Sequence, residues 1–190
     1  MGLRWLFPLF LFILCLSFLW WYTLGFSAFT VFSYTLKRAG ELPYPVPPLE
    51  VECHNGKRIN LSSERGTFMV NFIYLNCLYG CPISLAKMFQ LRKASPDLTF
   101  VSISVDPERD RIEDLRERWR AMDAFDNWYF CRPVGREWKK KLELLGVWVY
   151  RREDGLINHT LDLFFIKNGR VIKTFPPEYR VEEIFKEVKG

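Results

Sequence analysis

The clearest structural signal in the chain is Thr67-Phe-Met-Val-Asn-Phe-Ile-Tyr-Leu-Asn-Cys-Leu-Tyr-Gly-Cys-Pro82. Its first half, 67–74, is an almost continuous apolar run of β type, which predicts a strand buried on both faces. After Pro82, apolar residues recur at helical spacing. Proline suits the first turn of a helix because its missing N–H costs little there. The sequence therefore predicts a buried strand that runs directly into a helix, with Cys77 and Cys81 at the junction.

The segments on either side complete a mixed α/β pattern. Upstream, Asn55-Gly56 lies between two alternating runs, which is the strongest short signal for a hairpin. Downstream, the pattern predicts a strand, a charged helix, a short strand, a helix closed by Gly146, a hairpin around Asn168-Gly169 and a last helix; these span 98–105, 110–121, 128–130, 137–145, 160–175 and 181–188. This order is typical of a thioredoxin-like α/β domain, a mixed sheet flanked by helices on both faces.

The N-terminal part of the chain has a different character. No charged side chain occurs between Arg4 and Lys37, and about 20 apolar residues suffice to cross a bilayer. The apolar run exceeds the ~7–15 residues of a signal-peptide core and lacks a small-residue cleavage site. We therefore predict a retained transmembrane helix from Leu6 to about Phe26, with a buried core helix as the alternative.

The prolines of 41–48 then predict a stiff spacer, because proline fixes φ and removes hydrogen-bond donors. The predicted organisation is a membrane anchor over 1–36, a proline-rich spacer over 37–48 and the thioredoxin-like domain over 49–190. The net charge of +5 is spread through stretches of mixed sign. Because no basic block alternates with aromatic residues, the sequence excludes nucleic acid as a partner.

Two of the five cysteines lie at positions that indicate a functional role. Cys77 and Cys81 bracket the predicted start of a helix, where the helix dipole and free N–H groups favour a thiolate. Such a pair can close as a disulfide or hold one soft metal ion. A purely structural disulfide is the alternative, although closing so short a loop stabilises a fold little.

Three motifs, in this order, resemble the signatures of the Sco/SenC family: Tyr74-Leu-Asn-Cys-Leu-Tyr-Gly-Cys-Pro82, Ser104-Val-Asp-Pro-Glu-Arg-Asp110, and Asn158-His159-Thr160 ahead of a strand. The likeness extends from about Pro48 to the C-terminus. It implies that Cys77, Cys81 and His159 bind copper, as Cu(I) or also as Cu(II). Two thiolates and an imidazole are donors that suit Cu(I).

The chain departs from the family pattern at two places. The family often has proline and aspartate between its cysteines, where this chain has Leu78, Tyr79 and Gly80. The residue before the histidine is commonly aspartate in the family, and here it is Asn158. Loss of that carboxylate is expected to weaken the orientation of the imidazole.

The resemblance implies a membrane-anchored Cu(I) chaperone, not an enzyme, that delivers copper to the binuclear copper site of a cytochrome oxidase subunit. It implies a single-pass protein of the bacterial inner membrane with its soluble domain in the periplasm. The lack of a long Arg/Ser-rich presequence favours this location over the mitochondrial inner membrane. The alternatives are a membrane-tethered thiol–disulfide oxidoreductase, with Cys77 and Cys81 as redox pair, and a redox or copper sensor.

Three further residues, Cys53, His54 and Cys131, leave alternatives open. Cys53 and His54 adjoin the Asn55-Gly56 turn and form either a second copper site or an ordinary, partly exposed hairpin end. Cys131 is either buried and inert or paired with Cys53 in a disulfide, which an oxidising compartment would permit. Asp106 and Asp110 are predicted to fix the corner between strand and helix as turn and N-cap residues.

Overall fold

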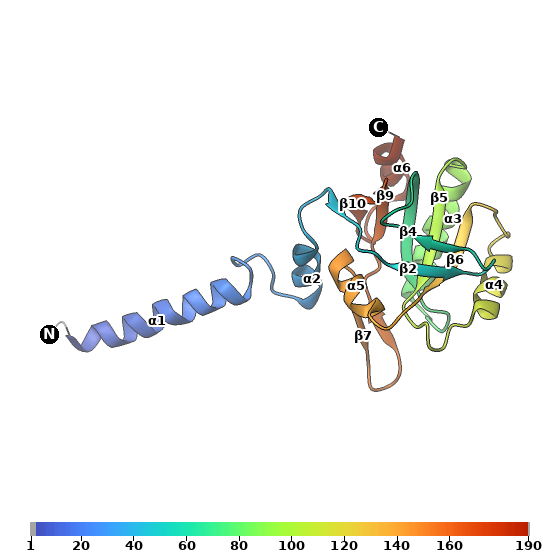
Figure 1. The fold of residues 1–190 in the computed structure, drawn as a ribbon. Coiled ribbons are helices and arrows are strands. Elements are labelled where there is room, and N and C mark those ends of the chain that lie inside the picture. The colour runs from blue at the N-terminus through green and yellow to red at the C-terminus, as the bar shows by residue number, and fades with distance from the viewer. Residues whose placement is uncertain (1–2, 190) are drawn as a thin grey trace.

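The computed structural model describes residues 3–189, so that Met1, Gly2 and Gly190, at the ends of the predicted anchor and domain, lie outside the described residues. Within this range one sheet of eight strands has the order β1-β10-β9-β4-β5-β6-β2-β3 (Figure 1). Its strands are β1 (Tyr44–Pro45), β2 (Glu50–Cys53), β3 (Arg58–Asn60), β4 (Thr67–Ile73), β5 (Thr99–Ser104), β6 (Trp128–Pro133), β9 (Leu163–Lys167) and β10 (Arg170–Phe175).

The centre of the sheet is mixed, as the sequence predicts. β4 pairs in parallel with β5 and antiparallel with β9, and β5 pairs in parallel with β6. Every residue of β4 after Thr67 is buried, because packed side chains cover both faces of this strand. The two predicted hairpin turns form: β2 pairs with β3 around Asn55-Gly56, and β9 with β10 around Asn168-Gly169.

The helices are α1 (Leu3–Tyr22), α2 (Val31–Ala39), α3 (Gly80–Ala94), α4 (Ile112–Ala121), α5 (Trp138–Leu145) and α6 (Val181–Lys189). α3 packs against β4 and α6. α5 ends at Gly146, whose φ of 92° is left-handed, so the predicted glycine stop is confirmed. The predicted N-cap is wrong, because Arg111, not Asp110, occupies the N-cap position of α4.

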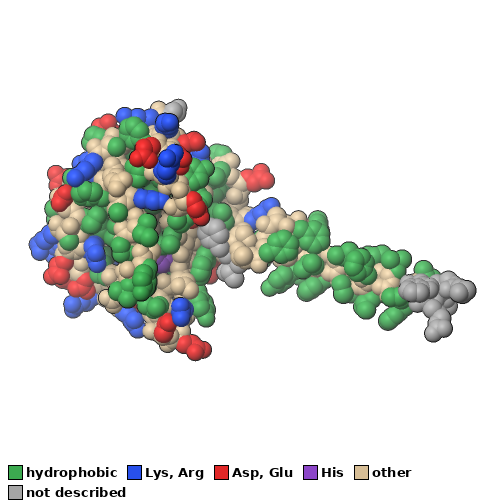
Figure 2. All heavy atoms as spheres, turned by 180° about the vertical axis from the view of Figure 1, so that it is seen from behind, with side chains coloured by type: hydrophobic (Ala, Val, Ile, Leu, Met, Phe, Trp, Pro, Cys, Tyr) green, Lys and Arg blue, Asp and Glu red, His purple; other side chains and the backbone are tan. Residues whose placement is uncertain are grey.

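The N-terminal helix α1 projects away from the domain (Figure 1). Figure 2 shows hydrophobic side chains along this projection, and the large apolar residues from Leu6 to Tyr22 are exposed. Among residues 3–189, no helix combines the length and the apolar character needed to cross a bilayer. The transmembrane helix predicted from Leu6 to about Phe26 is therefore not confirmed.

Part of the predicted spacer packs against the domain. Tyr44 pairs with Val171 of β10 and is buried, and its hydroxyl donates a hydrogen bond of 2.8 Å to the carbonyl of Leu145. α2 also contacts α5. The chain between α1 and the sheet thus follows the surface of the domain, and the limits predicted for the spacer and the domain stay predictions.

Candidate metal centre

The structure brings the three predicted copper ligands together. Cys77 lies in the loop between β4 and α3, and Cys81 lies in the first turn of α3. His159 ends β8 (Ile157–His159), which pairs with β7 (Val149–Arg151) in a separate two-stranded sheet that the sequence did not predict. The ligand atoms of the three residues all lie within 4.8 Å of one another. Folding therefore closes a separation of 78 residues between Cys81 and His159.

The pKa values of the two thiols are shifted in opposite directions. Burial acts to raise the pKa of Cys77, but hydrogen bonds at its sulfur, among them those with Cys81 and the backbone, outweigh burial and lower this pKa to about 6. One of them is the Cys81 backbone N–H, which donates to the Cys77 Sγ at 3.2 Å from the start of α3. Burial and the hydrogen bond with Cys77 raise the pKa of the Cys81 thiol. Cys77 is thus the thiolate of the metal-free centre, and Cys81 keeps its proton.

The imidazole of His159 is oriented for binding. Its Nδ1 lies 2.8 Å from the carbonyl oxygen of Thr160, so this nitrogen carries the proton and donates it. The Nε2 atom then presents its lone pair to the Cys81 Sγ, 3.4 Å away. The orienting partner is a backbone carbonyl, so the exposed Asn158 does not have to supply the carboxylate that the family commonly places there.

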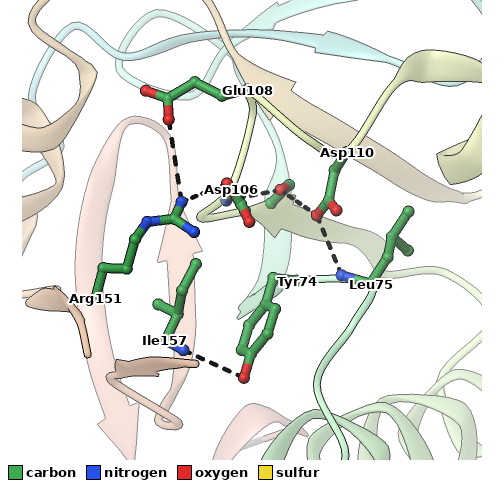
Figure 3. Close-up of polar contacts among 8 residues, drawn as sticks. Tyr74, Leu75, Asp106, Glu108, Asp110, Arg151 and Ile157 are labelled. Carbon is green, nitrogen blue, oxygen red and sulfur yellow. Dashed lines mark hydrogen bonds and ion pairs between the residues drawn. The ribbon is translucent and has the colours of Figure 1, made fainter. Parts of the chain in front are cut away.

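Tyr74 and Asp110 support the two sides of the centre. The Tyr74 ring meets the His159 ring edge-on, with 5.8 Å between the ring centroids. The Tyr74 hydroxyl accepts a hydrogen bond of 3.4 Å from the Ile157 N–H (Figure 3). Asp110 accepts a hydrogen bond of 3.1 Å from the Leu75 N–H. Leu75 lies at the start of the loop of residues 74–79 that carries Cys77, the cysteine loop. The sequence predicted that Asp110 fixes the corner between strand and helix, but its partner Leu75 lies 35 residues earlier, which no local pattern could reveal.

The centre opens onto the surface through an apolar groove. A cavity of about 460 Å³ lies beside Cys77 and His159, with Leu78, Tyr79 and Leu156 in its walls. Leu78 and Tyr79 are 71% and 79% exposed. Cys77 is partly exposed, whereas Cys81 is 2% exposed. A second molecule can therefore approach the centre from the side of Cys77.

The alternatives left open for Cys53, His54 and Cys131 are decided by packing. Cys53 and Cys131 face each other across β2 and β6 and form a disulfide. His54 is buried rather than partly exposed, stacks on Trp119 at 4.5 Å and accepts a hydrogen bond of 3.2 Å from the Phe130 N–H. No thiolate remains there for a second copper site. In the described part of the chain, Cys77, Cys81 and His159 are the one such group of potential metal ligands.

Comparison with known proteins gives consistent matches. The family model described as SCO1/SenC matches residues 46–190. The SCO1 protein homolog of Bacillus subtilis (strain 168) is 32% identical over 166 residues, which cover 80% of this chain and 86% of that protein.

Two solved structures illustrate the likeness of fold. BsSco, described as a member of the Sco family of cytochrome c oxidase assembly proteins with a disulfide switch, matches with a TM-score of 0.66 and 27% identity over 78% of this chain and 93% of that one. Arabidopsis thaliana ScoI with copper bound matches with a TM-score of 0.65 and 21% identity over 75% of this chain and 95% of that one.

Proposed function

Because the chain belongs to the SCO1/SenC family, we propose that it binds Cu(I) through Cys77, Cys81 and His159 and delivers it to the binuclear copper site of a cytochrome oxidase subunit. The observation that carries this proposal is the convergence of two thiols and one imidazole within 4.8 Å. Soft thiolates select Cu(I), and imidazole is a common third donor for copper. The copper bound to the Arabidopsis relative and the assembly role ascribed to the family of BsSco support the cargo and the acceptor.

The geometry suits a protein that hands its cargo on. The Cys77 thiolate meets the incoming ion first, because it is ionised and partly exposed. Cys81 then loses its proton, and the Nε2 atom of His159 completes a three-coordinate shell. Such a shell leaves room for a thiolate of the acceptor to bind the copper before the Cys77 bond breaks. Transfer can therefore proceed by stepwise exchange of ligands through the apolar groove.

We further propose that α1 anchors the chain in a bacterial inner membrane, with the domain in the periplasm rather than in a mitochondrion. The uncharged run between Arg4 and Lys37 and the exposed apolar side chains of α1 support an anchor. The Cys53–Cys131 disulfide supports an oxidising compartment, because such bonds are rare in the cytosol. Protease treatment of spheroplasts tests this location: the domain should be digested from outside, and its protection in intact spheroplasts would contradict the proposal.

A second candidate function is disulfide reduction in the acceptor. It is favoured by the pairing of a partly exposed thiolate at Cys77 with a buried thiol at Cys81, the arrangement of an attacking and a resolving cysteine. The Cys77 thiolate would attack the disulfide of the acceptor and form a mixed disulfide. Cys81 would then displace the acceptor as a dithiol and leave Cys77 and Cys81 joined.

The two functions are separated by an anaerobic Cu(I) titration of the reduced full-length chain in detergent, against a competing chromophoric chelator. We expect one Cu(I) per chain and an affinity at least about tenfold lower for His159→Ala. His54→Asn is the matched control, because asparagine can still accept the hydrogen bond from Phe130; its affinity should equal that of the wild type. An unchanged affinity in His159→Ala would favour the reductase, since thiol exchange does not need the imidazole.

A further inference from the structure

Arg151 links the hairpin that carries His159 to the loop after β5. Its guanidinium lies 2.6 Å from Oδ1 of Asp106, and the side chains of Arg151 and Asp106 are 35% and 5% exposed. Glu108 lies at 4.0 Å from the same guanidinium but is 68% exposed, so its attraction is screened by solvent. The bond to Asp106 is short, charge-assisted and largely withdrawn from water, and it is therefore the stronger contact.

Asp106 is in turn connected to the cysteine loop. Its backbone N–H donates a hydrogen bond of 3.0 Å to the Ser104 hydroxyl, which donates one of 2.6 Å to Oδ2 of Asp110. The same carboxylate oxygen accepts the N–H of Leu75, two positions before Cys77. Figure 3 shows Asp106 between Arg151 on one side and Asp110 on the other. One continuous chain of polar contacts thus joins both halves of the metal centre.

The hairpin needs such a restraint. Among the described residues, β7 and β8 pair only with each other and not with the main sheet. Arg151 lies opposite Ile157, near the turn, whereas His159 lies opposite Val149, near the base. Hydrogen bonds between Trp148 and Thr160 join the two strands at the base, and near the turn the N–H of the buried Ile157 donates a long hydrogen bond of 3.4 Å to the Tyr74 hydroxyl. On the other strand, directly opposite Ile157, the pair of Arg151 and Asp106 is the charge-assisted contact that ties this end of the hairpin to the loop after β5.

We propose that Arg151 and Asp106 are positioning residues, a clamp that keeps His159 beside the two sulfurs and thereby sets how firmly the centre retains copper. The inference rests on the proposed copper site. Two thiolates alone can hold Cu(I), so the imidazole contributes retention only while the hairpin is in place. If the hairpin is displaced for part of the time, the apparent dissociation constant for Cu(I) equals the intrinsic constant divided by the fraction of molecules in which the hairpin is in place. Loosening the clamp should therefore weaken copper binding through His159 alone.

The variant Arg151→Gln removes the ion pair, and Arg152→Gln is its matched control. Arg152 is the next residue of the same hairpin, is 51% exposed and pairs at 2.9 Å with Asp154 inside the hairpin, so it loses the same charge without touching the clamp. In the metal-free full-length chain we expect the backbone amides of 149–159 to exchange hydrogen about tenfold faster in Arg151→Gln and Asp106→Asn, and at the wild-type rate in Arg152→Gln. Equal rates in all variants would overturn the clamp.

The copper measurement tests whether the clamp acts through the imidazole. Arg151→Gln should bind Cu(I) about three- to tenfold more weakly than the wild type, and it should cause no further loss in a His159→Ala background. A loss of the same size in that background would show a merely structural role and overturn the proposal. If the wild type binds no Cu(I), the proposed function fails while the exchange rates still test the clamp. If the wild type binds Cu(I), and Arg151→Gln and Arg152→Gln have the same exchange rates and the same Cu(I) affinity, the clamp is refuted and the proposed function stands.

Discussion

Copper binding should release about one proton per ion at pH 8, and this proton should come from Cys81. Both cysteines must be thiolates to hold the metal, because the thiolate is the ligand form. The number of protons released therefore counts the cysteines that are still protonated in the metal-free chain. The perturbation is the addition of one equivalent of Cu(I) to the reduced chain.

The expected number follows from the two thiol pKa values. With a pKa of about 6, Cys77 is about 99% thiolate at pH 8 and contributes almost no proton. The Cys81 pKa is raised by burial above its ordinary value, which already exceeds 8, so its thiol contributes close to one proton. Because one proton competes with the ion, the apparent affinity should rise about tenfold, or ~1.4 kcal/mol, for each pH unit between 7 and 9.

The assay is an anaerobic titration in weak buffer with a pH indicator, repeated by calorimetry in buffers of different ionisation enthalpy. Two variants provide matched controls. Cys77→Ser should still release about one proton, whereas Cys81→Ser should release almost none, although both bind copper more weakly. Release of about two protons by the wild type would refute the low pKa of Cys77. If Cys77→Ser released almost no protons on binding Cu(I), the assignment of the proton to Cys81 would be refuted.

Three further predictions concern stability and packing. Burial raises the pKa of Asp162 to about 6, so the folded state loses stability as pH rises from about 4 to about 6; Asp162→Asn should gain up to ~3 kcal/mol at pH 7 and nothing near pH 4 in urea unfolding. An alanine Cβ at Gly80 would lie 2.9 Å from Leu161, so Gly80→Ala should cost about 1–2 kcal/mol, measured in the same assay, and adding Leu161→Ala should restore part of it. Replacing Cys53 and Cys131 together by alanine should lower the free energy of unfolding by about 2–4 kcal/mol and leave Cu(I) affinity unchanged.

The elements that could be predicted from the sequence are those with strong local signals. The apolar run of β4, the start of α3 around Pro82 and the hairpin turns at Asn55-Gly56 and Asn168-Gly169 all form as the patterns indicate. The three ligands were found through motifs, and folding then brought them together. Each of these features depends on residues close to one another in the chain, or on a resemblance that already contains the long-range information.

The features that escaped prediction depend on contacts between distant residues. The hairpin of β7 and β8 has short strands with little apolar alternation, so no period marks it. Arg151 looks like any exposed arginine of a charged stretch, and only the fold places it on Asp106, 45 residues earlier. The pairing of β1 with β10 likewise joins the proline-rich segment to a strand more than a hundred residues away. All three features depend on tertiary contacts that local sequence patterns do not encode.

The central claim is that His159 binds copper beside the two sulfurs, and X-ray absorption of the Cu(I)-loaded chain tests it most directly. The account predicts two sulfur neighbours and one nitrogen neighbour at the copper, with the nitrogen lost in His159→Ala and retained in His54→Asn. A first shell of sulfur alone in the wild type, identical to that of His159→Ala, would contradict it.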